Sequence, residues 1–257
     1  MATNWAVILG SSSGFGAAAA KAYAKAGYGI FGAHLDRRQA MPQIEALVEE
    51  LKGHGVPVHF HNANAAGDDE RAEAIAWLRE NAGPGSVRVL MHSLAFGTLR
   101  PYIGDGSLSR KQMEMTLDVM AHSIVYWAKD IVNADLFGDH GRIFGMTSSG
   151  SVAMWPSYGA VSAAKCALES HIRQLAVELA PKGITANAIM AGVTPTPALD
   201  KIPGAAQIQE RALARNPSGR LTTPEDIAEC MVALSAPGTH WLTGNVLQVD
   251  GGEVISG

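Results

Sequence analysis

A short apolar run followed by a glycine-rich loop opens the chain. Trp5–Leu9 is entirely apolar, and the loop after it has the spacing G-x-x-x-G-x-G before an alanine-rich stretch at 17–26. A run this short and apolar predicts a strand buried on both faces of a parallel sheet, and the alanines favour a helix. Glycines in such a connection allow a tight turn and let phosphates approach backbone N–H groups at the helix N-terminus. The segment therefore predicts a pyrophosphate site built from Gly10, Ser12, Ser13, Gly14, Phe15 and Gly16.

Strand-like and helix-like segments then alternate to the end of the chain. Further strands are predicted at 28–34, 56–62, 87–91, 142–146, 185–190 and 243–252. Helices are predicted at 41–52, 69–81, 110–133, 160–180 and 202–215, with a last one starting at Pro224 with Thr223 as N-cap. This alternation predicts one α/β domain over residues 1–257, a Rossmann fold with a doubly wound, seven-stranded parallel sheet. Ligands bind at the carboxyl ends of the strands in such sheets.

The overall composition excludes several classes of function. The formal net charge of −4 gives no support for nucleic acid or an anionic membrane as a partner. The two cysteines, Cys166 and Cys230, are too few for a disulfide framework or a metal cage, and no apolar run is long enough to span a bilayer. These features predict a soluble, cytoplasmic protein without a metal site.

The residues after the second predicted strand bear on the choice of nucleotide. An acid at this point binds the ribose 2′-hydroxyl of NAD, whereas arginines neutralise the 2′-phosphate of NADP. The chain has His34 at the strand end, followed by Asp36, Arg37 and Arg38. Two arginines against one aspartate, with His34 rather than an acid at the strand end, favour NADPH, and NADH is the alternative. Asp36 either binds the 2′-hydroxyl and repels a phosphate, or pairs with one arginine and holds it in position. A solvated charged turn is the other interpretation of Asp36.

Tyr158 and Lys165 form a second candidate site. The residues after Pro156 are predicted to form a helix, on which the two side chains lie within about 20° of each other after two turns. Because a nearby ammonium favours phenolate, we expect Lys165 to lower the pKa of Tyr158 and the pair to serve proton chemistry. Considered alone, the same spacing is also typical of a tyrosine at a helix start followed by a solvated lysine.

Three motifs together resemble the short-chain dehydrogenase/reductase family over essentially the whole chain. They are the glycine loop, the set Ser148, Tyr158 and Lys165, and the terminal Val249-Asp250-Gly251-Gly252. Most members of that family carry Tyr-x-x-x-Lys, whereas here Val161 stands four residues before Lys165.

Other departures resemble the divergent, enoyl-acyl-carrier-protein reductase branch of the family. They are the Tyr-x6-Lys spacing, His92-Ser93-Leu94-Ala95 in place of Asn-Asn-Ala-Gly, Met120 in place of a helix asparagine, and Ala191-Gly192 in place of Pro-Gly. Leu99-Arg100-Pro101 and the stretch 216–220 resemble its NADPH-using members. Many enoyl reductases have a second tyrosine ten residues before the first, and here that position is Ser148.

The resemblance implies NAD(P)H-dependent reduction of a trans-2-enoyl thioester, as in fatty acid synthesis. Tyr158 would donate a hydrogen bond to the thioester oxygen, and Lys165 would hold the nicotinamide ribose. Ser148 would orient the substrate carbonyl or be merely a strand-end hydroxyl.

His92 is expected to be partly buried, bonded to backbone and without a catalytic role. The remaining cofactor contacts are expected at the strand ends, at His34, Asp36, Arg37, Arg38, Asn64, Ala65, Ser93, Leu94, Ala95, Thr147, Ala191, Gly192, Val193, Thr194 and Thr196.

Two further expectations concern the cover of the site and the assembly. The segment 193–216 is expected to be a mobile cover over the cleft. The helices 110–133 and 158–180 carry apolar residues around much of their circumference. One face of the sheet is not expected to bury all of these side chains, and helix pairing across a two-fold axis would bury the rest, which predicts a homotetramer. The residues in question are Met113, Met115, Met120, Ile124, Trp127, Ile131, Ile172 and Leu175.

Alternative functions stay open at this point. The first is a carbonyl reductase or hydroxy-dehydrogenase of the same family, for example on a 3-oxoacyl thioester. The second is a nucleotide-binding protein without turnover. The chain length of the acyl group, and acyl carrier protein or coenzyme A as its carrier, are also open.

Overall fold

A seven-stranded sheet forms the centre of the computed structural model, which describes residues 3–256. The strands are β1 (Trp5–Leu9), β2 (Gly29–His34), β3 (Val58–Asn62), β4 (Val87–His92), β5 (Phe137–Ser148), β6 (Thr185–Ala191) and β7 (Val246–Val249). Their order is β3-β2-β1-β4-β5-β6-β7, and every neighbouring pair is parallel. The predicted doubly wound sheet is confirmed, and its order reverses beside β1, where such sheets bind ligands.

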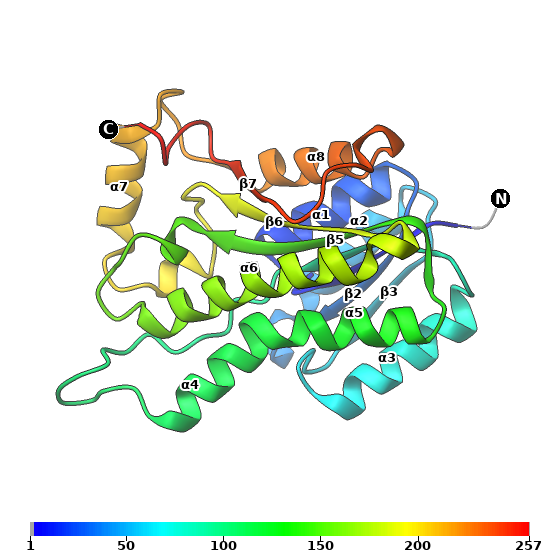
Figure 1. The fold of residues 1–257 in the computed structure, drawn as a ribbon, viewed down its shortest axis with the longest axis horizontal. Helices are drawn as coiled ribbons and strands as arrows, with labels where there is room; N and C mark the ends of the chain where they lie inside the picture. The colour runs from blue at the N-terminus through cyan, green and yellow to red at the C-terminus, as the bar shows by residue number, and fades with distance from the viewer. Residues whose placement is uncertain (1–2, 257) are drawn as a thin grey trace.

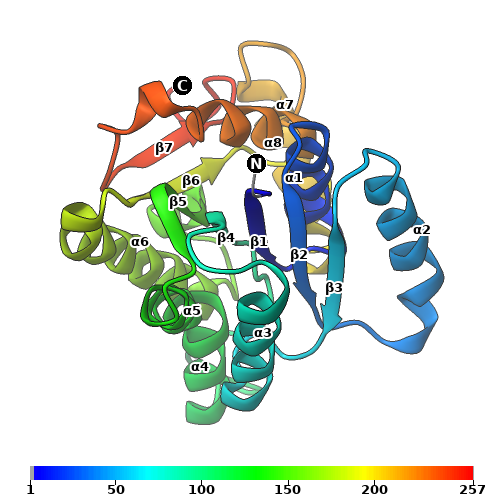
Figure 2. The same cartoon turned by 90° about the vertical axis from the view of Figure 1, so that its right-hand side faces the viewer.

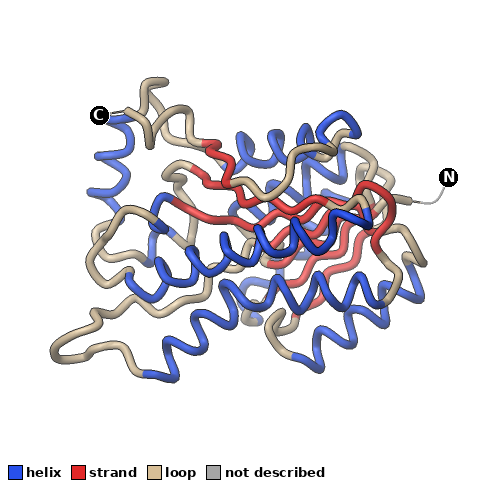
Figure 3. Tube along the Cα trace, in the orientation of Figure 1, coloured by secondary structure: helices blue, strands red, loops and turns tan. Residues whose placement is uncertain are grey.

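Helices cover both faces of the sheet (Figures 1 and 2). One layer contains α1 (Gly14–Lys25), α2 (Met41–Lys52) and α8 (Pro224–Leu234), and the other contains α3 (Asp68–Asn81), α4 (Arg110–Leu117), α5 (Ser123–Asn133) and α6 (Gly159–Leu179). β1, β2 and β6 are buried along their whole length because helices pack on both of their faces. α7 (Ala205–Arg215) lies beyond the carboxyl ends of the strands, at the left of Figure 1. Long loops gather at the same end (Figure 3).

Several element boundaries differ from those predicted. β5 begins at Phe137 rather than at residue 142, and β7 is confined to Val246–Val249. α1 begins inside the glycine loop, at Gly14. The long helix predicted over 110–133 is divided by a π-helical turn, Asp118–His122. Thr223 caps α8 as predicted, in a capping box with Asp226.

The prediction that the long helices carry more apolar residues than the single chain can bury is wrong. Six of the eight residues are buried within the single chain: Met120, Ile124, Trp127, Ile131, Ile172 and Leu175. They lie in one core between α3, α5, α6 and the sheet, and the Trp127 indole N–H also donates to the Ala65 carbonyl at 2.7 Å. The helices therefore bury more of their circumference inside the chain than their pattern indicates, and this argument for a tetramer fails.

Within residues 3–256, no helix combines the length and apolar character needed to cross a bilayer. The same part of the chain contains no group of three or more His, Cys, Asp or Glu residues placed to hold a metal ion.

Candidate active site

The glycine loop fills the angle between the ends of β1, β2 and β4. The N–H groups of Gly10 and Ser11 both donate to the Ala33 carbonyl, at 2.8 and 3.1 Å. Gly10 has φ +88°, and a Cβ there would lie 2.5 Å from the Ser93 carbonyl oxygen. A Cβ at Gly16 would collide with the Gly10 carbonyl. Only glycine permits this packing, which explains the first and last glycines of the motif.

The N-terminus of α1 is open to a ligand. Its N-cap residue, Ser13, is extended and makes no side-chain capping bond. The first turn of a helix has N–H groups without intrahelical partners, and they favour an anion. Gly14 lies beside Thr196, whose Cγ2 would be 3.5 Å from a Cβ at that glycine. The loop after β6 thus meets the glycine loop beside the N-terminus of α1.

The loop after β6 is held by its own hydroxyls and by one buried acid. The Thr194 hydroxyl donates to the Gly192 carbonyl at 2.9 Å, and the Leu199 N–H donates to Thr196 Oγ1 at 3.3 Å. The Val193 N–H donates to Glu253 Oε2 at 2.9 Å, and burial raises the pKa of this carboxyl. The two threonines therefore cap a turn, and the side chain of Thr196 lies beside Gly14 of the glycine loop.

The end of β2 has a different ion pair from the one predicted. Asp36 does not pair with an arginine in the described residues; its Oδ2 lies 3.1 Å from Nδ1 of the buried His34. Asn62 fixes the same turn, because its side-chain amide accepts from the Asp36 N–H and donates to the Asp36 carbonyl. Arg37 and Arg38 are exposed and have no ion-pair partner within residues 3–256. The acid is thus turned inward and the two guanidinium groups outward.

In the turn after β3, the Asn64 side-chain oxygen and the Ala65 carbonyl already accept hydrogen bonds within the protein. Asn64 Oδ1 accepts from the Ala66 N–H at 3.1 Å, and the buried Ala65 gives its carbonyl to the Trp127 indole. Asn62, which the sequence-based assignment passed over as a site residue, has the larger role here. In the sequence, Asn62 is marked only as the last residue of the strand predicted at 56–62. In the structure it pairs with His34, the last residue of β2.

Tyr158 is the N-cap residue of α6 and does not lie within the helix. Its ring covers the α-carbon of Gly150, so that any side chain at that glycine would collide with it. Ser148 Oγ would be 3.2 Å from the same added Cβ, so the serine hydroxyl and the phenol ring meet over Gly150. Ser148 Oγ is buried and has no hydrogen-bond partner in residues 3–256. A buried hydroxyl without a partner is costly, and it suits a ligand that supplies one.

Burial raises the pKa of Tyr158, and the nearby Ser148 hydroxyl opposes that rise. The prediction that Lys165 lowers the pKa of Tyr158 is wrong. The Lys165 ammonium points instead to the Met146 carbonyl of β5, with an Nζ···O distance of 2.7 Å. The Tyr158 phenol is therefore protonated at neutral pH and can offer its O–H to a ligand.

Lys165 is 8% exposed. Burial lowers its pKa from 10.5 to about 8, and the Glu169 carboxylate one turn later partly opposes the fall. Glu169 also accepts a hydrogen bond from Thr147 Oγ1 at 2.6 Å. An ammonium has three donors, and only one is bonded to protein here. The other two are available to hydroxyls of a bound ligand.

His92, at the end of β4, is fully buried rather than partly buried. Its Nε2 is 2.8 Å from Ser123 Oγ, and that hydroxyl donates in turn to the Val119 carbonyl. Burial, followed by the charge of Lys165, lowers its pKa to about 3. The imidazole is therefore neutral, and the two residues after it, Ser93 and Leu94, lie against Gly10 of the glycine loop.

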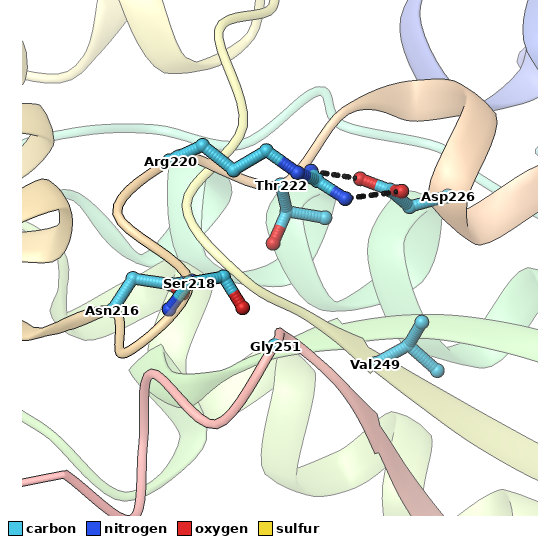
Figure 4. Close-up of a pocket in the computed structure, with 7 residues that line it drawn as sticks. All are labelled: Asn216, Ser218, Arg220, Thr222, Asp226, Val249 and Gly251. Carbon is cyan, nitrogen blue, oxygen red and sulfur yellow. Dashed lines mark hydrogen bonds and ion pairs between the residues drawn. The ribbon is translucent and has the colours of Figure 1, made fainter.

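A pocket of about 260 Å³ beside β7 contains none of the predicted site residues (Figure 4). It is lined by Asn216, Ser218, Arg220, Thr222, Asp226, Val249 and Gly251. Arg220 and Asp226 form a two-bond ion pair, at 2.6 and 2.8 Å, which holds the pKa of the Asp226 carboxyl well below its usual range. Because that pair neutralises the arginine, the pocket offers no free charge to a nucleotide.

The site at the carboxyl edge of β1, β2, β4, β5 and β6 suits a nicotinamide dinucleotide. It combines a glycine cradle, an uncapped helix N-terminus, two exposed arginines, an ammonium with free donors and an unpaired serine hydroxyl.

Comparisons with known proteins agree with this assignment. The family model described as Enoyl-(Acyl carrier protein) reductase matches residues 10–253. Enoyl-(acyl-carrier-protein) reductase (NADH) FabI from Aquifex aeolicus is 30% identical, over 88% of this chain and 83% of that protein. 3-oxoacyl-(acyl-carrier-protein) reductase FabG from Thermotoga maritima is 26% identical, over 97% of each chain. The crystal structure of the Aquifex aeolicus VF5 reductase superimposes with a TM-score of 0.83 at 27% identity, covering 99% of this chain and 97% of that one.

Proposed function

Because the chain belongs to the short-chain dehydrogenase/reductase family, in its enoyl-acyl-carrier-protein reductase-like branch, we propose that it reduces the C2=C3 double bond of a trans-2-enoyl thioester. Members of this oxidoreductase family use NAD(P)H. The observation that carries the proposal is the Tyr158 phenol, kept protonated by burial and set beside an unpaired Ser148 hydroxyl at the end of β5.

The reaction requires stabilisation of negative charge on the thioester oxygen. When bound, NAD(P)H would supply the hydride for C3 of the enoyl group, and a proton from solvent would add to C2 to complete the saturated product. Tyr158 donates a hydrogen bond to the oxygen on which charge then develops, as an oxyanion-hole donor does. Ser148 donates a second hydrogen bond to the same oxygen. Lys165 uses its two free N–H donors to hold the nicotinamide ribose.

Val161 supports enoyl over carbonyl reduction. In the Tyr-x-x-x-Lys pattern this position holds the proton donor, and here the valine is buried in the core, in contact with Gly97. A carbonyl substrate needs a full proton transfer to its oxygen. In the enoyl reaction the oxygen needs only a hydrogen-bond donor, because the proton is taken up at C2 instead. The pKa of Tyr158, raised by burial, suits the second task.

The nucleotide is NADPH in this proposal, because Arg37 and Arg38 face outward without acidic partners while Asp36 is engaged by His34. The segment 193–216 covers the substrate. In α7 only Ala212 is buried, so the helix has few contacts that oppose its displacement. Acyl carrier protein is the proposed carrier of the thioester, because the matching family model and the Aquifex relative are both named for it. A homotetramer is proposed on the resemblance to the family alone, since the argument from surplus apolar residues fails.

Initial rates with crotonyl and acetoacetyl thioesters, each with NADPH, test this function. The proposal predicts faster NADPH oxidation with the crotonyl compound. Preference for the acetoacetyl compound would instead favour a 3-oxoacyl reductase, the activity in the name of the Thermotoga relative. Tight NADPH binding without oxidation by either thioester would favour a nucleotide-binding protein without turnover.

A further inference from the structure

Trp155 joins the loop before Tyr158 to the segment that covers the site. Its indole N–H donates to the Pro203 carbonyl at 2.8 Å. A Cβ at Gly204 would lie 3.0 Å from Cζ2 of the indole, so the ring packs directly on the backbone at the start of α7. The Arg211 guanidinium lies over the ring, 5.4 Å from its centroid. One side chain thus makes three different contacts with the segment 203–211.

The same residue begins the turn that presents Tyr158. The Tyr158 N–H donates to the Trp155 carbonyl at 3.1 Å, with Pro156 and Ser157 between them. Ser157 has φ +63°, a left-handed conformation that side chains other than glycine and asparagine rarely adopt. A proline followed by a residue of positive φ is the arrangement of a type II turn. Serine in place of glycine makes this turn strained, so its geometry depends on contacts that hold its ends.

We propose that Trp155 is a positioning residue, which holds α7 over the cleft through Pro203, Gly204 and Arg211 and fixes Tyr158 through the turn that it begins. The side chain touches neither the cofactor site nor the reacting atoms. It acts by tying closure of the cover to the placement of the phenol. The kinetic part of this inference rests on the proposed enoyl reductase function, whereas the contact between Trp155 and α7 does not.

Amide hydrogen exchange of the full-length protein tests the contact without any substrate. Three variants separate its components: Trp155→Phe removes the N–H donor and keeps a ring, Arg211→Gln removes the cation, and Trp155→Ala removes all. One hydrogen bond or one exposed cation–π contact corresponds to roughly two- to tenfold in a local opening equilibrium. We therefore expect exchange over 205–215 to be roughly threefold faster in Trp155→Phe and Arg211→Gln, and at least about tenfold faster in Trp155→Ala.

Two controls identify effects on the whole fold. Trp241→Ala removes a tryptophan that is 90% exposed, and it should leave exchange over 205–215 unchanged. Peptides from β1 and α1 should exchange at the wild-type rate in every variant. Wild-type exchange over 205–215 in Trp155→Ala, with an intact core, would overturn the inference.

Steady-state kinetics with crotonyl thioester and NADPH test the effect on Tyr158. Trp155→Ala should raise KM for the thioester and lower kcat, with the Kd for NADPH within about twofold of wild type. A variant whose α7 exchanges faster but whose kcat and KM are both unchanged would refute the link to Tyr158. A wild-type protein that does not reduce the thioester refutes the proposed function instead, and the exchange experiment still decides the contact.

Discussion

Replacing Lys165 by methionine should stabilise the cofactor-free protein while abolishing its function. The ammonium is 8% exposed, and burial lowers its pKa from 10.5 to about 8. At pH 7 the amine is still charged, so folding places a charge inside the protein. A fall of that size corresponds to roughly 3 kcal/mol of unfavourable free energy.

Methionine has a similar length and no charge, so Lys165→Met removes that term. It also leaves the Met146 carbonyl without its donor, which costs about 1 kcal/mol. The net expectation at pH 7 is a stabilisation of about 2 kcal/mol. For a chain of this size that raises Tm by roughly 4–8 °C.

The sign of the pH dependence follows from the direction of the shift. Because the pKa in the folded state lies below that in the unfolded state, the unfolded chain binds more protons between pH 8 and 10.5. The free energy of unfolding of the wild type therefore rises as the pH rises through this window. Lys165→Met lacks this titration, so the difference in stability between the two proteins shrinks. Thermal unfolding of both proteins at pH 7 and pH 10, at one protein concentration, measures the difference. A Lys165→Met protein that is less stable than wild type at pH 7, or equally shifted at both pH values, would refute the reasoning.

Three further predictions follow from the site and the assembly. Tyr158→Phe should lower kcat by roughly two orders of magnitude, the effect of losing one oxyanion donor, with NADPH affinity nearly intact; unchanged turnover would remove Tyr158 from the mechanism. Arg37→Ala/Arg38→Ala should weaken NADPH binding in fluorescence titrations while leaving NADH binding almost unchanged, because both guanidinium groups are free of acids; an equal loss for both nucleotides would contradict their role. Light scattering at micromolar concentration should give the mass of a homotetramer, and a monomer mass would rule that assembly out.

The sheet was predictable from the sequence because apolar strand-like segments alternate with helix-forming segments along the chain, most clearly at β1, β2, β4 and β6. β1 and α2 have the predicted bounds, and the strand order follows the expected doubly wound pattern. The glycine loop was predictable from its place between an apolar strand and an alanine-rich helix, and the structure explains Gly10 and Gly16, where a Cβ would collide with neighbouring backbone.

Side-chain partners were harder to predict, because tertiary contacts choose them. The Lys165 ammonium bonds to a carbonyl of β5, 19 residues earlier in the chain, and not to the tyrosine at helical spacing. Asp36 pairs with His34 and not with an arginine. Asn62, from the neighbouring strand, fixes the backbone of Asp36 through two hydrogen bonds and so sets the direction of its side chain. Trp155 has no sequence signal, since its partners Pro203 and Arg211 are about 50 residues away.

The position of transferred deuterium tests the central claim most directly. NADPH carrying deuterium at the transferable C4 position is incubated with crotonyl thioester, and the product is analysed by mass spectrometry and NMR. The account predicts a saturated butyryl thioester with one deuterium at C3, and loss of that product in Tyr158→Phe. Unchanged crotonyl thioester, together with deuterated 3-hydroxybutyryl thioester formed from the acetoacetyl compound, would contradict it.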